Sequence, residues 1–309
     1  MIVALSVLWG SAFMMVKVAL DGGVPALTLV AGRFAGAVLV LGLVLLVTRQ
    51  RLRLNRDALA AFLVLGVVNN VWPFVLLTWG QERIDSSLAA ILTASMPLST
   101  VILAHFWIGE RITLDRVVGV LVGFCGVFLL IGTDLRDITE SSTLGQLAII
   151  AGVLGYSTGT VYARRYLQQD VGGDATAAGQ MLVGTMVMVP LALAVETPFD
   201  LSISAKTALA WSALGVLPSA IAYMIYYRLL RDVTATQASM IGYLIPITAV
   251  SLGAFVLDER LAATSFAGLA LIIVGVWVVN GGGLWLAQRV ERRGIDITPV
   301  RGGGNGADG

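Results

Sequence analysis

Charged residues, cysteine and histidine are all scarce in this sequence of 309 residues. Only 13% of the residues are Asp, Glu, Lys or Arg, whereas 57% are hydrophobic. Soluble domains carry about 25% charged residues, so the composition excludes a soluble protein and predicts one embedded in a lipid bilayer. The net charge of +1 argues against a nucleic-acid partner, because such a partner calls for a strongly basic surface.

The chain has one cysteine, Cys125, and one histidine, His105, and this excludes several kinds of active site. Metal sites need clustered His, Cys or acidic ligands, and nucleophilic catalysis needs a base beside its nucleophile. We therefore expect no metal, no cofactor and no enzyme activity, and we expect Cys125 to serve packing. His105 has a side chain that titrates near neutral pH, but a packed neutral ring is the favoured interpretation.

Ten apolar stretches are each long enough to cross a bilayer, which needs about 20 residues per helix. They lack the alternating polarity, over about ten residues, of membrane β-strands. The sequence thus predicts an all-α integral membrane protein with ten transmembrane helices. The spans cover about 2–20, 25–47, 58–79, 86–108, 114–132, 144–164, 175–195, 207–229, 234–256 and 261–286.

A proline in the middle of a span, followed by a Glu-Arg pair, occurs twice. Pro97 and Glu110 recur 149 residues later as Pro246 and Glu259. Each half holds five spans, so the second half enters the membrane from the opposite side, and the two repeats are inverted. Such repeats are typical of secondary transporters. We expect a first repeat over 1–133, a periplasmic linker over 134–143, a second repeat over 144–286 and a disordered cytoplasmic tail over 287–309.

The paired prolines predict two kinked helices around a central cavity. Proline removes a hydrogen bond inside a helix, and a membrane tolerates this only where other groups satisfy the freed carbonyl. A role for Pro97 and Pro246 in packing alone is the alternative, because proline is common in transmembrane helices.

The distribution of positive charge predicts the orientation of the chain. Fourteen of its twenty Lys and Arg residues fall in segments on the same side as the N-terminus. Positive loops face the cytoplasm, so we expect both termini to be cytoplasmic.

Several segments resemble a known family. The segment DSSLAAILTASMPLSTVILAHFWIGERITLDRVVGVLVGFCGVFLL and its second copy, ending in LDERLAATSFAGLALIIVGVWVV, are similar to the EamA repeat of the drug/metabolite transporter superfamily. WGSAF at 9–13 and GRF at 32–34 resemble the first two helices of that family. The resemblance implies ten helices in inverted repeats, a bacterial inner membrane and the export or exchange of small metabolites.

Arg33 is the main candidate for binding a substrate, because it falls within the second span. A charge at the centre of a membrane helix costs about 2.5–3.5 kcal/mol on insertion scales and usually faces a cavity or a partner. We expect Arg33 to bind an anionic group such as a carboxylate. Snorkelling or a structural hydrogen bond is the alternative of equal weight. In the second half, Gln180 is the polar residue nearest to the matching position.

Polar and aromatic residues at membrane depth occur in six spans, the first, third, fourth, sixth, eighth and ninth, and predict the lining of a cavity. Ser219 and Tyr226 belong to this group. Spans five and ten lack such residues, and their glycines suit close helix packing, so we expect these two spans to be peripheral. The predicted lining, besides Arg33, is Trp9, Ser11, Asn70, Trp72, Thr93, Tyr156, Ser157, Tyr223, Gln237 and Tyr243.

Three charged residues near span ends have weaker interpretations. Glu110 and Glu259 are expected to begin spans five and ten, where an acid near a helix N-terminus is favoured, and a gating salt bridge is the alternative. Lys17 is expected to snorkel to the surface. Carboxylates, the usual proton carriers of coupled pumps, are absent from the middle of the spans. The sequence therefore does not identify a coupling ion.

Together these observations predict a secondary transporter that moves small organic metabolites across the bacterial inner membrane, with export as the expected direction. Amino acids or related compounds are candidate substrates. The lipid bilayer is the expected environment, and the sequence allows both a monomer and a homodimer. A membrane sensor or a structural membrane protein is the alternative, because neither needs special chemistry.

Overall fold

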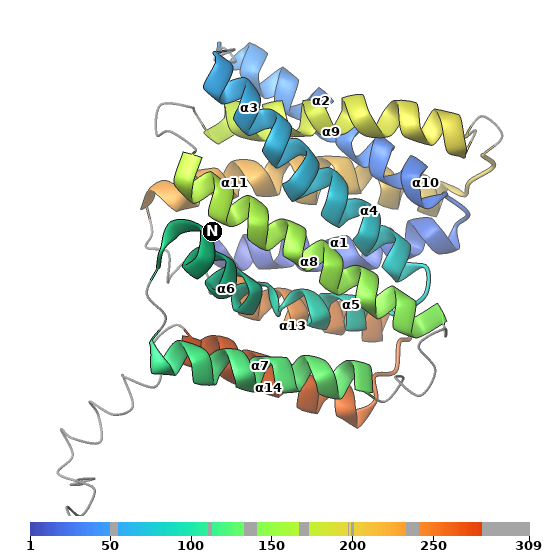
Figure 1. Cartoon of the computed structure of the whole chain (residues 1–309). Coiled ribbons are helices and arrows are strands. Elements are labelled where there is room, and N and C mark those ends of the chain that lie inside the picture. Colours follow the sequence, from blue (N-terminus) through green and yellow to red (C-terminus); the bar gives the residue numbers. More distant parts are fainter. Residues whose placement is uncertain are drawn as a thin grey trace, which may run out of the picture.

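The chain forms a bundle of helices in the computed structural model, which describes residues 1–49, 55–110, 113–132, 141–166, 173–196, 198, 201–232 and 241–279. The predicted tail and most of the predicted linker lie outside these residues. Within them the regular structure is helical, with no strand (Figure 1). The helices are α1 (Ile2–Asp21), α2 (Ala26–Val47), α3 (Arg56–Val64), η1 (Leu65–Val71), α4 (Trp72–Gln81), α5 (Ser86–Thr93), α6 (Met96–Ile108), α7 (Leu114–Gly132), α8 (Ser141–Tyr166), α9 (Gly173–Val195), α10 (Ala205–Leu214), η3 (Gly215–Ile221), α11 (Ala222–Asp232), α13 (Ile241–Val256) and α14 (Ala263–Val279).

Seven helical runs are long and apolar enough to cross a membrane, from Ile2–Asp21 to Ala205–Leu229. The apolar helix α7 and the shorter apolar helices Leu244–Val256 and Ala263–Val279 complete ten spans. The prediction of an all-α membrane protein with ten helices is thus confirmed. At one end of the bundle α1, α4, α9 and α13 finish and α2, α5, α10 and α14 begin. We call this the Glu259 end.

The third helix of each repeat contains a π-helical segment. Span three runs through α3, η1 and α4, and span eight runs through α10, η3 and α11. A π-helical segment adds a residue to the turn and often occurs at functional sites. η1 starts at Leu65, one residue before Gly66, and η3 starts at Gly215. Gly66 and Gly215 are equivalent under the shift of 149.

Each π-helical segment packs on a helix of the other repeat through its glycine. A Cβ atom on Gly66 would come within 2.6 Å of Val183 in α9, and one on Gly215 would lie 3.1 Å from Cα of Gly36 in α2. Glycine therefore permits both close approaches.

Span four is divided in two, whereas α13, the described part of span nine, is one continuous helix. α5 ends at Thr93 and α6 begins at Met96, with Pro97 in its first turn. The backbone N–H and the Oγ of Ser95 both donate to the carbonyl of Leu92, which closes the end of α5. Pro246, by contrast, lies inside the continuous helix α13. The equivalent prolines thus stand in different local structures.

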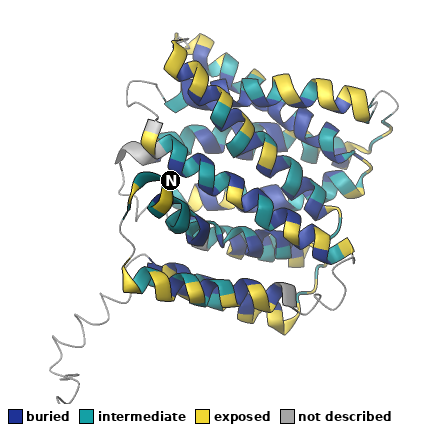
Figure 2. Cartoon of the chain, in the orientation of Figure 1, coloured by how far each residue is buried: buried dark blue, intermediate teal, exposed yellow. Residues whose placement is uncertain are grey.

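Helices α7 and α14 lie side by side at the lower edge of the bundle in Figure 1. Their outward residues are exposed in Figure 2, whereas the residues between them are buried. A Cβ on Gly275 would lie 2.5 Å from the carbonyl oxygen of Gly119, and one on Gly126 would lie 2.7 Å from that of Gly268. Small residues let membrane helices approach closely, so spans five and ten form the expected peripheral pair.

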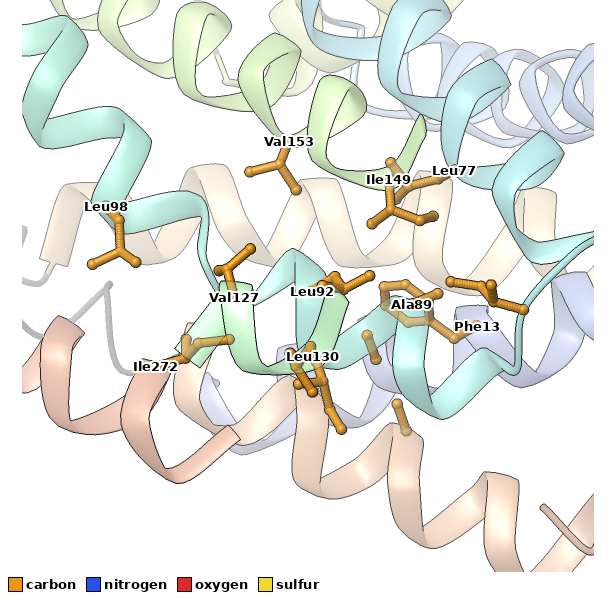
Figure 3. Packing of buried hydrophobic residues seen from close by; sticks show 14 of the residues in the cluster. Phe13, Leu77, Ala89, Leu92, Leu98, Val127, Leu130, Ile149, Val153 and Ile272 are labelled. Atoms are coloured by element: carbon orange, nitrogen blue, oxygen red, sulfur yellow. The ribbon is translucent and has the colours of Figure 1, made fainter. Parts of the chain in front are cut away.

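A buried apolar cluster joins this pair to the remaining helices. Figure 3 shows Leu98 of α6, Val127 of α7 and Ile272 of α14 among its members, with Val153 of α8 nearby. Lipid is as apolar as these side chains, so close packing and hydrogen bonds, rather than burial from water, hold such helices together.

Candidate functional site

Arg33 lies on α2 and is only 8% exposed. Its Nε donates a hydrogen bond to Oγ of Ser219 at 2.7 Å, and its Cζ lies 4.1 Å from the centre of the Phe74 ring. Among the described residues, no carboxylate pairs with Arg33 and its two Nη atoms donate no hydrogen bond. Arginine presents five donors in a planar fork, so the donors of both Nη atoms lack a partner among the described residues.

The π-helical segment η3 sets the orientation of Ser219. The hydroxyl of Ser219 donates to the carbonyl of Leu214, five residues earlier, at 2.8 Å. This spacing is that of a π-helix. Because the Ser219 hydroxyl donates its proton to Leu214, its oxygen is free to accept the hydrogen bond from Nε of Arg33. Ser219 therefore orients the guanidinium without using the Nη donors.

Asn70 is the equivalent of Ser219 in the first repeat and belongs to η1. It is fully buried, and its Oδ1 accepts a hydrogen bond from the hydroxyl of Tyr223 at 3.2 Å. Its Nδ2 has no partner, an arrangement that is costly for a buried donor. Phe74, which contacts Arg33, and Tyr223 are also equivalent under the shift of 149. One member of each equivalent pair, Ser219 and Phe74, therefore contacts Arg33, and the other members, Asn70 and Tyr223, bond to each other.

Aromatic rings extend this cluster. Trp9 of α1 lies 5.9 Å from Tyr223 and 5.3 Å from Tyr226, measured between ring centres. Its indole N–H donates to the carbonyl of Pro218 within η3 at 3.1 Å. Tyr156 of α8 meets the ring of Phe74 edge-on, with the ring centres 6.1 Å apart. Rings from four spans thus belong to the cluster, and the ring of Phe74 contacts the guanidinium directly.

Gln180 of α9 forms the far end of the polar cluster. It is fully buried, and its Nε2 donates to the hydroxyl of Tyr227 at 3.2 Å. The ring of Tyr227 lies 6.3 Å from that of Tyr223. The Oε1 of Gln180 has no partner. The cluster therefore offers unpaired donors at Arg33 and Asn70 and an unpaired acceptor at Gln180.

Other residues of the predicted lining lie elsewhere. The hydroxyls of Ser11 and Thr93 bond within their own helices, and that of Ser157 donates to the carbonyl of Met96 at 3.1 Å, which joins α8 to α6. Trp72 is 52% exposed and donates to the carbonyl of Ala151. Gln237 and the side chain of Tyr243 lie outside the described residues.

Phe74 and Tyr227 belong to the cluster but not to the predicted lining. Phe74 is apolar, so a search for polar residues passes over it. The shift of 149 would have found it, because it places Phe74 on Tyr223.

Glu259 has a different role from the expected one. Its carboxylate accepts hydrogen bonds from the N–H groups of Ser86 and Ser87, which start α5. It therefore caps a helix of the other repeat and not span ten. Glu110 accepts from Nη1 of Arg116 at 3.3 Å. Lys17 donates to the carbonyl of Gln81 and pairs with Asp21 at 3.6 Å.

His105 lies in the last turn of α6 and is partly buried. Its Nδ1 forms a hydrogen bond of 2.7 Å with the carbonyl oxygen of Glu110, so Nδ1 carries the proton. A backbone contact of this kind suits the expected packed ring.

Comparison with known proteins identifies relatives over nearly the whole chain. The chain is 31% identical over 280 residues to a probable terminal-alkyne amino-acid exporter of Streptantibioticus cattleyicolor, with 89% of this chain and 90% of that protein covered. It is 22% identical to the uncharacterized transporter YoaV of Bacillus subtilis, covering 90% and 94% of the two chains. It is 27% identical to the uncharacterized inner membrane transporter YedA of Escherichia coli, covering 90% and 89%.

The fold is also found in a solved crystal structure of a protein with 22% sequence identity, at a TM-score of 0.65 over 93% of this chain and 96% of that chain. The EamA-like transporter family matches the sequence twice, over residues 1–132 and 143–281. The double match accords with two repeats of five spans each, which are necessarily inverted. The chain is therefore a multi-pass membrane protein that belongs to the EamA-like transporter family.

Proposed function

We propose that this protein exports small organic metabolites that carry a carboxylate, and that Arg33 binds this carboxylate. One observation carries the proposal: Arg33 is buried without an acidic partner among the described residues, and its Nη edge is unused. A buried charge is costly unless it is paired, and a carboxylate would provide a bidentate partner for the guanidinium.

The unpaired atoms of the cluster favour amino acids or related compounds. A carboxylate would accept from Arg33 and from Nδ2 of Asn70, whereas an ammonium group would donate to Oε1 of Gln180. Apolar parts of a substrate would contact Trp9, Tyr223 and Phe74. The amino-acid exporter among the relatives supports this substrate class and the direction.

The proposed cycle is alternating access between the two inverted repeats, with both termini in the cytoplasm. The contact of Arg33, in the first repeat, with Ser219, in the second, supports this cycle, because such transporters hold their substrates between the repeats. In this orientation the Glu259 end faces the periplasm of the inner membrane. One chain supplies both repeats, so the cycle does not require a dimer.

The test compares metabolites in the medium and in the cytoplasm of cells that express the wild type, Arg33→Gln, Arg33→Lys or an empty vector. Lys17→Gln is the matched control, since it removes a charge at the Glu259 end. We expect the wild type and the control to enrich one or more carboxylates outside. We expect Arg33→Gln, present in the membrane at the same amount, to lose this export, and Arg33→Lys to retain part of it.

Two results would count against the proposal. Export by Arg33→Gln at the wild-type rate would remove Arg33 from the site. Equal metabolite levels with the wild type and the empty vector, across several nutrient loads, would favour a sensor or structural role instead.

A further inference from the structure

The carboxylate of Glu259 holds the first turn of α5. It accepts from the backbone N–H of Ser86 at 2.8 Å, from that of Ser87 at 3.0 Å and from Oγ of Ser87 at 2.5 Å. Hydrogen bonds to an ionised group are about twice as strong as neutral ones, and an anion at a helix N-terminus is further favoured by the helix dipole. Three contacts of this kind form a specific tie between two helices.

The tie crosses from one repeat to the other. Glu259 follows α13 in the second repeat, whereas α5 belongs to the first. The residue at the N-cap of α5 is Asp85, and its own side chain makes no capping bond. The first turn of α5 therefore depends on a carboxylate of the opposite repeat.

Gly253 lets α13 approach this tie. A Cβ atom on Gly253 would lie 2.2 Å from Oγ of Ser87 and 2.3 Å from Oε2 of Glu259. Real Cβ atoms do not come so close, so a methyl group here would displace both atoms. The displaced atoms are the ends of side chains, so the tie would open while the backbone stayed in place.

The helix held by Glu259 is short and separated from the rest of its span. α5 covers Ser86–Thr93 and ends at the break before Met96 and Pro97. A break of this kind lets one part of a span move relative to the other, as in the hinges of moving elements. Release of Glu259 would thus free α5 without disrupting α6.

A second carboxylate at the same end has the same chemistry in a different setting. Glu196 accepts from the N–H of Leu27 at 2.9 Å and from the N–H and Oγ1 of Thr28, each at 2.7 Å. It caps α2, a continuous helix of 22 residues that packs along α9, the helix preceding Glu196. Its partners are therefore held together by more than the cap.

We propose that Glu259 is the latch of a gate at the Glu259 end of the bundle. While the carboxylate caps α5, this helix and α13 close that end. When the contact breaks, α5 separates from α13 and opens a path toward the Arg33 cluster. Glu259 is a positioning residue in this scheme, since it acts through α5. The role in transport and the side of the membrane rest on the proposed function, whereas the contact itself does not.

The experiment measures how fast a buried thiol becomes accessible. Ala249 lies one turn before Gly253 on the same face of α13, and it is 1% exposed. In a Cys125→Ser background, Ala249→Cys would be the single thiol. Its reaction with a membrane-impermeant maleimide is followed in intact cells and in inside-out vesicles, without substrate, for chains that also carry Glu259→Gln, Gly253→Ala or Glu196→Gln.

We expect Glu259→Gln and Gly253→Ala each to raise the labelling rate in intact cells by about tenfold, the factor that the loss of a charge-assisted hydrogen bond would give. Glu196→Gln should leave the rate unchanged. Because Gly253→Ala keeps every charge, a rise shared by Gly253→Ala and Glu259→Gln would show that the contact itself, and not the charge, controls labelling.

Unchanged labelling with both Glu259→Gln and Gly253→Ala, or an equal rise with Glu196→Gln, would overturn the proposal. A rise confined to inside-out vesicles would support the latch and reverse the proposed orientation. A rise without any exported compound would support the latch and contradict the proposed function.

Discussion

Asn70 and Ser219 occupy equivalent positions 149 residues apart, and each is fully buried in the π-helical segment of its own repeat. Their partners differ. Ser219 accepts a hydrogen bond from Arg33, whereas Asn70 accepts one from Tyr223. The backbone around the cluster is therefore nearly symmetric, and its charge is not.

The contact between Ser219 and Arg33 predicts a change in substrate affinity. Ser219→Ala removes the acceptor of Nε, so the guanidinium loses its orientation but keeps its charge. We expect the substrate concentration at half-maximal transport to rise about tenfold, the factor for a hydrogen bond to a charged group. Transport of a carboxylate into or out of vesicles measures it. The control is Ser251→Ala, an exposed hydroxyl that bonds within its own helix, and equal rises in both variants would contradict the role of Ser219.

The glycine contacts between α7 and α14 predict that a larger residue at Gly275 lowers the stability of the protein. A methyl group on Gly275 would meet the backbone of Gly119 and Gly123 at about 2.5–2.6 Å. Overpacking of this kind costs roughly 1–3 kcal/mol, so we expect Gly275→Ala to lower the midpoint of thermal unfolding in detergent. Gly42→Ala is the control, because a Cβ there meets nothing within 4 Å. An unchanged midpoint for Gly275→Ala would show that the two helices separate without cost.

Asp85 predicts a pH dependence at the Glu259 end. Loss of water around its side chain raises the pKa of Asp85, the nearby charge of Glu259 and that of Asp21 raise it further, and Lys17 opposes the rise. The native state thus binds this proton more tightly than the unfolded chain. The contribution of Asp85 to the free energy of unfolding therefore falls as pH rises from about 4, the ordinary pKa, through the raised pKa, and is constant above it.

Asp85→Asn cannot titrate, so we expect it to be more stable than the wild type at pH 7 and to lose this advantage as pH falls toward 4. Midpoints of thermal unfolding over that range measure the difference. The advantage should shrink in a Glu259→Gln background, which removes one cause of the raised pKa. A difference that stays constant with pH would contradict the argument.

The sequence was enough to predict the helices, because ten apolar runs leave little choice of fold in a bilayer. It also singled out Arg33, since a lone charge in an apolar span has few explanations. The face that each residue presents was harder to predict. The additional residue of η1 rotates everything after it by about 100°, since an α-helix has 3.6 residues per turn. Trp72 follows directly after η1, so depth alone did not show that it would be exposed.

The partner of Glu259 could not be predicted from the sequence for another reason. The serines that it caps are more than 170 residues earlier in the chain. An acid after one helix usually belongs to the next helix, and only the three-dimensional contact between α13 and α5 changes that assignment. Phe74 shows that the repeat itself was a better guide than polarity, because its position matches that of Tyr223.

The matched π-helical segments also bear on how the two repeats evolved. A π-helical segment arises when one residue is inserted into an α-helix, and the simplest way to find one in both halves is that the insertion preceded the duplication. The ancestor would then have been a five-helix protein whose two copies, facing opposite ways, each supplied the same residue to a shared centre. Such a centre would bind any ligand equally well in two orientations. Under the proposed function, the divergence into Asn70 and Ser219, with Arg33 in one repeat only, would give the centre a single preferred direction for its ligand.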